Sequence, residues 1–133
     1  MAATILVVED NEKNRRLIKD VLEYHGYRII EAANGAEGVQ IARERKPALI
    51  LMDIQMPVMD GMSAAKLIRS DPSMKGISMI ALTSFAMKGD KERFLEAGFD
   101  DYLAKPIDTR KLPEVVKQYL AGRRSERPEA GDP

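Results

Sequence analysis

The chain has 133 residues, of which 44% are hydrophobic, and its 21 basic and 21 acidic side chains cancel formally. This length and composition suit one domain that buries an ordinary core without disulfide or metal cross-links. The neutral balance leaves no global field to attract nucleic acid, anionic lipid or acidic substrates, and the lack of cysteine excludes disulfides, thiolate nucleophiles and cysteine metal sites.

We expect no targeting signal at the start of the chain. Only residues 1–3 precede the first apolar run, which leaves no room for a basic and then apolar leader. No apolar stretch approaches the roughly 20 residues that a helix needs to span a bilayer. We therefore expect a cytoplasmic protein that does not enter a membrane.

Short apolar runs alternate along the chain with segments whose apolar residues recur at helical spacing. The expected strands cover residues 4–8, 28–32, 48–52, 78–82 and 102–104. The expected helices are the charged segment that closes at Gly26 and then, approximately, residues 36–45, 63–70, 88–97 and 113–120. This alternation predicts an α/β domain with a parallel sheet covered on both faces.

The domain is expected to occupy residues 1–121. From Gly122 the sequence reads GRRSERPEAGDP, which has no apolar residue larger than alanine or proline and mixes both charges. Such a segment buries too little apolar surface to fold, so we expect residues 122–133 to form a disordered tail.

Polar groups follow four of the predicted strands. The run LILMD ends at Asp53, ILVVED ends at Glu9 and Asp10, SMIALTS includes Thr83, and DYLAKP includes Lys105. Functional groups of a parallel α/β sheet gather at the carboxyl ends of its strands, so these side chains are expected to meet. One acid at a strand end is most often a cap or turn residue, and for Glu9 helix capping and metal binding are both open.

The three acids indicate a cation site. Glu9, Asp10 and Asp53 would repel one another unless a proton or a cation intervenes, and hard oxygen ligands suit Mg2+. We expect Asp10 and Asp53 to be direct ligands. A carboxylate held against Mg2+ and Lys105 stays ionised and can attack phosphorus, which makes Asp53 the candidate nucleophile. Mg2+, Lys105 and the Thr83 hydroxyl would then meet the charge on the phosphoryl oxygens.

The motifs VVEDN, LMDIQMPVMDG, ALTS and LAKPI resemble the signatures of two-component response-regulator receiver domains, in register across almost the whole chain. The resemblance implies a flavodoxin-like (βα)5 fold with strand order 2-1-3-4-5 and helices on both faces. It implies that Asp53 accepts a phosphoryl group from a histidine kinase or a histidine phosphotransfer protein. By the same resemblance, Mg2+ is bound by Glu9, Asp10, Asp53 and the Gln55 backbone carbonyl, and the phosphoryl group is contacted by Lys105 and Thr83.

The resemblance also implies a conformational switch. In the family, the Thr83 hydroxyl moves toward the phosphoryl oxygens and the aromatic at Tyr102 turns inward, while a cis peptide bond before Pro106 holds Lys105 toward the site. Two positions that vary in the family, Gln55 and Phe85, flank the site here. We expect the Phe85 ring to screen the acyl phosphate from water and so to prolong the phosphorylated state.

The expected partners are proteins. The family often binds them on the fourth helix, the fifth strand and the last helix, as a monomer or as a phosphorylation-dependent dimer. The segment SFAMKGDKERFLEAGFDDYLAKPI is similar to stand-alone receivers of the DivK type. We therefore expect a signalling switch that assists only its own phosphorylation and dephosphorylation, with no direct binding of nucleic acid.

Three other functions are open. A pseudo-receiver would bind partners without phosphorylation. A haloacid-dehalogenase-like phosphatase also uses a strand-end Asp, Mg2+, a hydroxyl group and a Lys, but it expects a second Asp where this chain has Gln55. A flavodoxin-like cofactor carrier needs a phosphate-binding first loop rich in glycine and hydroxyl groups, whereas EDNEKN is acidic.

Overall fold

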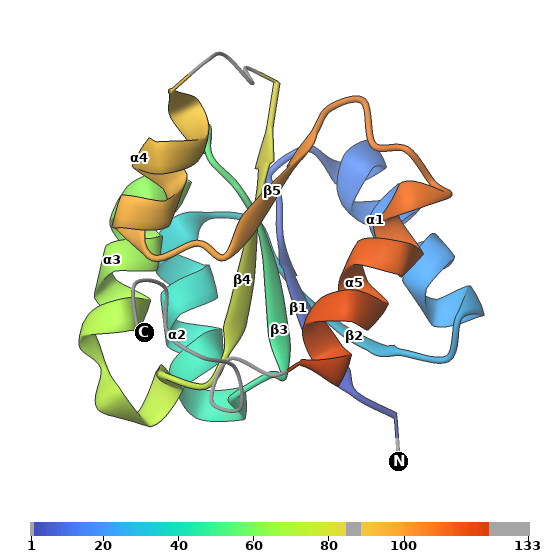
Figure 1. Cartoon of the computed structure of the whole chain (residues 1–133), viewed down its shortest axis with the longest axis horizontal. Helices are drawn as coiled ribbons and strands as arrows, with labels where there is room; N and C mark the ends of the chain where they lie inside the picture. Colours follow the sequence, from blue (N-terminus) through green and yellow to red (C-terminus); the bar gives the residue numbers. More distant parts are fainter. Residues whose placement is uncertain (1, 85–88, 123–133) are drawn as a thin grey trace.

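The structure is a computed structural model and describes residues 2–84 and 89–122. Its centre is a five-stranded parallel sheet with strand order β2-β1-β3-β4-β5 (Figure 1). The strands are β1 (Thr4–Val8), β2 (Arg28–Ala32), β3 (Leu49–Asp53), β4 (Ser78–Thr83) and β5 (Asp101–Ala104). The predicted fold class and strand order are therefore confirmed.

Helices cover both faces of the sheet in the described part of the chain. They are α1 (Glu12–Tyr24), α2 (Gly35–Arg45), α3 (Gly61–Ser70), the short 3-10 helix η1 (Pro72–Met74), α4 (Asp90–Ala97) and α5 (Lys111–Ala121). Figure 1 shows α1 and α5 on one side of the sheet, and α2, α3 and α4 on the other. None of the described helices has the length and apolar character needed to span a membrane.

Alternating side chains of the central strands build two separate cores. Along β1, Ile5 and Val7 pack with α1 and α5, whereas Leu6 and Val8 pack with α2, α3 and α4. Every residue of β3 and β4 is buried, as expected for inner strands of a sheet that is covered on both sides. Because helices cover both faces, the sheet remains accessible at the ends of its strands.

The observed boundaries differ from the predicted ones by one or two residues for local reasons. Helix α3 begins at Gly61 rather than at residue 63, because the Asp60 side chain accepts a hydrogen bond from the backbone N–H of Ser63 and caps the helix. Helix α5 begins at Lys111 and includes Pro113 in its first turn, where no intrahelical N–H donor is required. The 3-10 helix η1 was not predicted.

Candidate functional site

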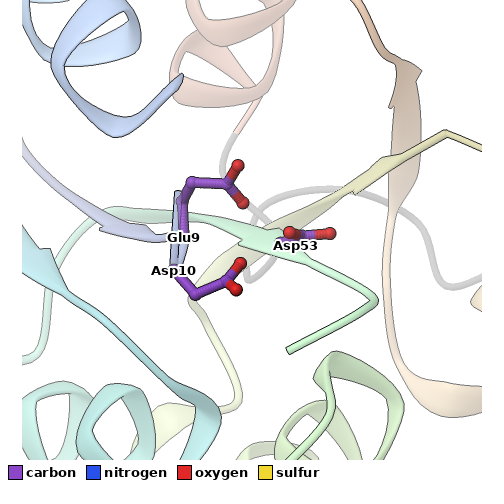
Figure 2. A group of neighbouring side chains, drawn as sticks. All are labelled: Glu9, Asp10 and Asp53. Atoms are coloured by element: carbon purple, nitrogen blue, oxygen red, sulfur yellow. The ribbon is translucent and has the colours of Figure 1, made fainter. Parts of the chain in front are cut away.

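The carboxyl ends of the strands bring the predicted polar residues to one edge of the sheet. Glu9 and Asp10 directly follow β1, and Asp53 is the last residue of the neighbouring strand β3. Figure 2 shows their three carboxylates turned toward the same space. One carboxylate oxygen from each lies within 4.8 Å of the others. The acids that the sequence analysis grouped therefore form a single cluster.

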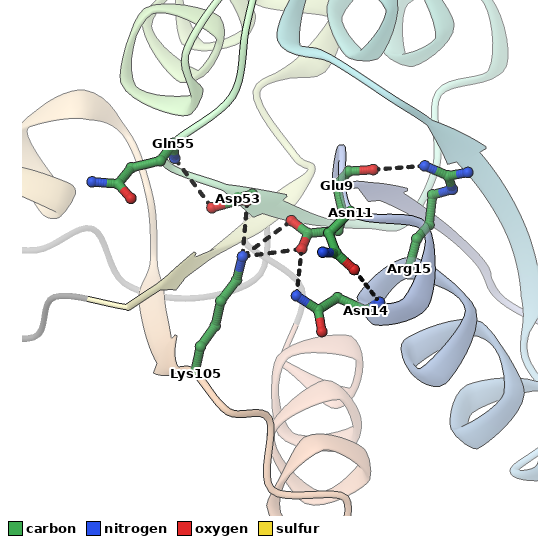
Figure 3. A network of polar contacts seen from close by, with 7 residues as sticks. All are labelled: Glu9, Asn11, Asn14, Arg15, Asp53, Gln55 and Lys105. Carbon is green, nitrogen blue, oxygen red and sulfur yellow. Dashed lines mark hydrogen bonds and ion pairs between the residues drawn. The ribbon is translucent and has the colours of Figure 1, made fainter.

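Lys105 reaches this cluster from β5, two strands away from β3 in the sheet. It directly follows the edge strand β5, and its Nζ donates hydrogen bonds to Asp53 Oδ2 at 2.8 Å and to Glu9 Oε1 and Oε2 at 3.0 and 3.2 Å (Figure 3). The Glu9 side chain is fully buried and the Lys105 side chain is 16% exposed. Thus one ammonium group contacts two of the three clustered carboxyl groups, and acids outnumber the lysine in the cluster.

Burial and the neighbouring charges change the protonation of the cluster. Burial, together with the neighbouring Asp53, raises the pKa of Glu9 from 4.5 to about 7. Burial by itself lowers the pKa of Lys105, but its hydrogen bonds and charge interactions with Asp53 and Glu9 outweigh this effect and raise the pKa. Lys105 therefore stays charged at neutral pH, while the raised pKa of Glu9 favours its protonated form.

The first turn of α1 holds Glu9 in two ways that the sequence analysis missed (Figure 3). The Asn14 side chain donates from Nδ2 to Glu9 Oε1 at 3.0 Å, and the Arg15 guanidinium donates to the main-chain oxygen of Glu9 at 2.9 Å. Asn11 caps the helix, because its side chain accepts the backbone N–H of Asn14. The only local signal for this arrangement is the Asn cap itself, which fixes where the first turn begins.

The loop between β3 and α3 packs tightly against Asp53. The backbone N–H of Gln55 donates to Asp53 Oδ1 at 3.1 Å, and Gly61 donates to the main-chain oxygen of Ile54 at 2.9 Å. A Cβ atom on Gly61 would overlap the main-chain oxygen of Asp53. Glycine is therefore required at this close approach of the loop to the strand end.

The same loop contains a strained residue. The backbone N–H of Met59 donates to the oxygen of Pro57 at 2.8 Å, and the central residue of this γ-turn, Val58, has a φ of 70°. A β-branched residue rarely adopts positive φ, and the Val58 side chain is 83% exposed, so core packing does not explain its position.

The predicted switch residues lie on β4, which pairs with the strand that ends at Asp53, and on β5, the next strand beyond β4. Thr83 ends β4 and is buried, and its main-chain oxygen accepts the backbone N–H of Lys105 at 2.8 Å. Tyr102 is half-buried on β5, with its ring 5.7 Å from that of Phe94 on α4. The peptide bond between Lys105 and Pro106 is cis. Phe85 lies outside the described residues, so its screening role stays a prediction, and so does the disorder of the tail, whose residues 123–133 are also outside them.

The donor atoms of the cluster fit Mg2+. They are all carboxylate oxygens from Glu9, Asp10 and Asp53, and Asp10 is exposed to solvent, which leaves room for water and for phosphate oxygens around an ion. The negative excess is the electrostatic condition that a divalent cation would relieve. Among the described residues, the cluster contains no histidine nitrogen or cysteine sulfur that would favour a softer metal ion.

Known proteins share both the sequence and the fold. The family model described as the response regulator receiver domain matches residues 5–117. The polar-differentiation response regulator DivK of Brucella anthropi is 43% identical over 120 residues, which cover 90% of this chain and 98% of that protein. The DivK of Brucella ovis is 42% identical over the same shares.

Two solved structures place the site in context. The receiver domain of a sensor histidine kinase from Pseudomonas aeruginosa, solved with a magnesium ion coordinated in the active site cleft, matches with a TM-score of 0.84 and 38% identity over 91% of this chain and 99% of that one. The receiver domain of Ssk1 from Saccharomyces cerevisiae, in complex with the histidine phosphotransfer protein Ypd1, matches with a TM-score of 0.85 and 32% identity over 91% and 90%. The family match, the curated relatives and the fold agree: the chain belongs to the response regulator receiver domain family and is similar to DivK.

Proposed function

We propose that the chain is a response regulator whose receiver domain accepts a phosphoryl group on Asp53 from a phosphohistidine donor, in a reaction that depends on Mg2+. The observation that carries the proposal is the contact of 2.8 Å between Lys105 Nζ and Asp53 Oδ2 beside two further carboxylates. The chain covers 98% of the length of the DivK of Brucella anthropi, and this supports the proposal that the receiver acts as a single-domain regulator.

The geometry supports a direct transfer to Asp53. One of its oxygens attacks phosphorus, the phosphorus–nitrogen bond of the donor breaks, and the histidine nitrogen keeps the electron pair, which leaves an aspartyl phosphate. The backbone N–H of Gln55 holds Asp53 Oδ1, and Lys105 holds Oδ2. These two contacts fix the orientation of the nucleophile.

The surrounding residues meet the charge of the phosphoryl group. Mg2+ would be held by Asp10 and Asp53, with Glu9 and the Gln55 backbone carbonyl assisting, and would supply positive charge to the phosphoryl oxygens. The Lys105 ammonium then turns from the carboxylate to a phosphoryl oxygen, and the Thr83 hydroxyl, at the end of the adjacent strand, donates to another.

The switch would act on the face formed by α4, β5 and α5. Movement of Thr83 alters the packing of Tyr102, which touches Phe94 on α4, and so couples the site to this face. We propose that a downstream protein, or a second copy of the chain after phosphorylation, prefers one of the two states. A histidine kinase or a histidine phosphotransfer protein in the cytoplasm would supply the phosphoryl group, as the complex of the Ssk1 receiver with Ypd1 suggests.

Incubation with acetyl phosphate, followed by intact-protein mass spectrometry, tests the proposal. Wild type and Asp53→Asn are each treated with Mg2+ and with EDTA. We expect a gain of one phosphoryl group only in the wild type with Mg2+. No gain, also with candidate kinases, would favour the pseudo-receiver, and rapid turnover of external phosphate esters would favour the phosphatase.

A further inference from the structure

The Glu9 carboxylate is the acid of the cluster that has no access to solvent. Among the described residues, this carboxylate accepts two hydrogen bonds from Lys105 and one from Asn14, and it also interacts with the Asp53 carboxyl group. Lys105 also binds Asp53 and is needed by the incoming phosphoryl group in the proposed function. Asn14 is a neutral donor from a different element, so it can hold Glu9 throughout the reaction.

The position of Asn14 is itself fixed by its helix. The Asn11 side chain accepts the backbone N–H of Asn14 at 3.0 Å, so the first turn of α1 is capped at this residue. The next residue, Arg15, donates to the main-chain oxygen of Glu9 and to Glu31 Oε1 on β2 at 3.3 Å. The first turn of α1 therefore binds Glu9 twice: Arg15 binds its main-chain oxygen and Asn14 binds its carboxylate. These contacts fix the position of the Asn14 amide relative to the acid.

A buried carboxylate that lies beside a cation site needs its oxygens oriented. Hydrogen-bond partners behind the ligands of a metal commonly change its affinity about 10–100-fold when they are removed. We propose that Asn14 is a positioning residue of the magnesium site, which orients the Glu9 carboxylate through its Nδ2–H bond to Oε1; this rests on the proposed function. Among the described residues, the side-chain hydrogen bond of Asn14 goes to Glu9 and not to Asp10 or Asp53.

Isothermal titration with Mg2+ alone, without a phosphoryl donor, tests this role. Asn14→Ala keeps the net charge and favours the helix, because Ala has the higher helix propensity, so a change in affinity reports the lost hydrogen bond. We expect the Kd of this variant for Mg2+ to rise about tenfold. Arg16→Ala is the control, because it changes the same helix at a residue whose side chain is 81% exposed. Its lost charge is screened by solvent, so the Kd for Mg2+ should change by no more than about twofold.

A double-mutant cycle separates positioning from a general structural effect. If Asn14 acts through Glu9, Asn14→Ala should add nothing to the Kd of Glu9→Gln. An unchanged Kd for Asn14→Ala, or an equal loss in the Glu9→Gln background, would overturn the inference. If the wild type binds Mg2+ but accepts no phosphoryl group, the proposed function is wrong, whereas the role of Asn14 at the magnesium site is not contradicted. A wild type that binds no Mg2+ overturns both.

Discussion

The two ends of the sheet both bury charged groups, but with opposite balance. At the carboxyl end, Lys105 contacts Glu9 and Asp53, and Asp10 belongs to the same cluster of acids. At the amino end, Arg69 on α3 pairs with Asp100 just before β5, at 3.1 Å between Nη2 and Oδ2. These last two side chains are 12% and 7% exposed. Among the described residues, the carboxyl end gathers three acids around one lysine, whereas at the amino end Arg69 and Asp100 form an ion pair.

The balanced pair is also tied to the backbone. Arg69 donates to the main-chain oxygens of Gly98 and Met74 at 2.8 and 3.3 Å, and Asp100 accepts the backbone N–H of Met79 at 2.9 Å. These contacts join α3, η1, β4 and the end of α4. A charge pair satisfied in this way stabilises the fold. The end with excess acids is instead the one where we propose that a cation binds, so charge balance separates the end with the ion pair from the end with the proposed site.

Breaking the balanced end should have the largest effect on stability. Arg69→Met removes the guanidinium that lies 3.1 Å from the buried Asp100 carboxylate and should lower the free energy of unfolding by about 3–5 kcal/mol. Urea denaturation with and without Mg2+ measures this, and we expect the same loss in both. Arg93→Met, at an ion pair whose arginine side chain is 71% exposed, is the matched control and should change stability by about 1 kcal/mol or less. A loss that Mg2+ restores would contradict a purely structural role.

The acid cluster at the carboxyl end of the sheet should make the free energy of unfolding depend on pH. The pKa of Glu9 is about 7 in the folded protein and 4.5 ordinarily, so the folded state holds this proton more tightly than the unfolded chain. Without metal, the free energy of unfolding should therefore fall by up to about 3 kcal/mol as pH rises between these values. Added Mg2+ should offset the fall, because it favours the ionised acids.

Urea denaturation of the metal-free protein across this pH range checks the effect. Glu9→Gln removes the titrating group and should flatten the dependence. A slope of the opposite sign in the wild type, or the same slope in Glu9→Gln, would show that Glu9 is not the group responsible.

A change next to Asp53 tests how closely the loop sets the acceptor. In Gly61→Ala the added Cβ meets the main-chain oxygen of Asp53, so we expect a loss of about 1–3 kcal/mol and slower phosphorylation by acetyl phosphate. Gly26→Ala is the control, because no atom lies within 4 Å of its Cβ and only the positive φ is unfavourable. Equal phosphorylation rates in both variants would show that the loop does not position Asp53.

The smallest expected effect is a gain in stability at Val58. Glycine tolerates a φ of 70°, and the valine side chain is 83% exposed, so Val58→Gly should stabilise the protein by about 0.5–1 kcal/mol. Val58→Ala keeps a Cβ and should remain close to the wild type. Thermal unfolding of the three proteins measures the difference, and a lower melting temperature for Val58→Gly would mean that the turn is not strained.

The sequence predicted the parts of the molecule that depend on local pattern. The five strands and the strand-end residues Asp53, Thr83 and Lys105 followed from apolar runs with polar ends, because parallel strands bring such ends together. Asn14 and Arg15 were not predicted, since their contact with Glu9 depends on how α1 packs beside β1. The pair formed by Arg69 and Asp100 joins residues 31 positions apart, which no local pattern reveals.

The most direct test of the account is the location of the phosphoryl group. Reduction of an acyl phosphate with borohydride converts the acceptor aspartate to homoserine, which proteolysis and tandem mass spectrometry can place in the sequence. After treatment with acetyl phosphate and Mg2+, we predict homoserine at Asp53 and its absence with EDTA. Homoserine at Asp10 instead, or at no aspartate even with a cognate kinase, would contradict the assignment of Asp53 as the acceptor.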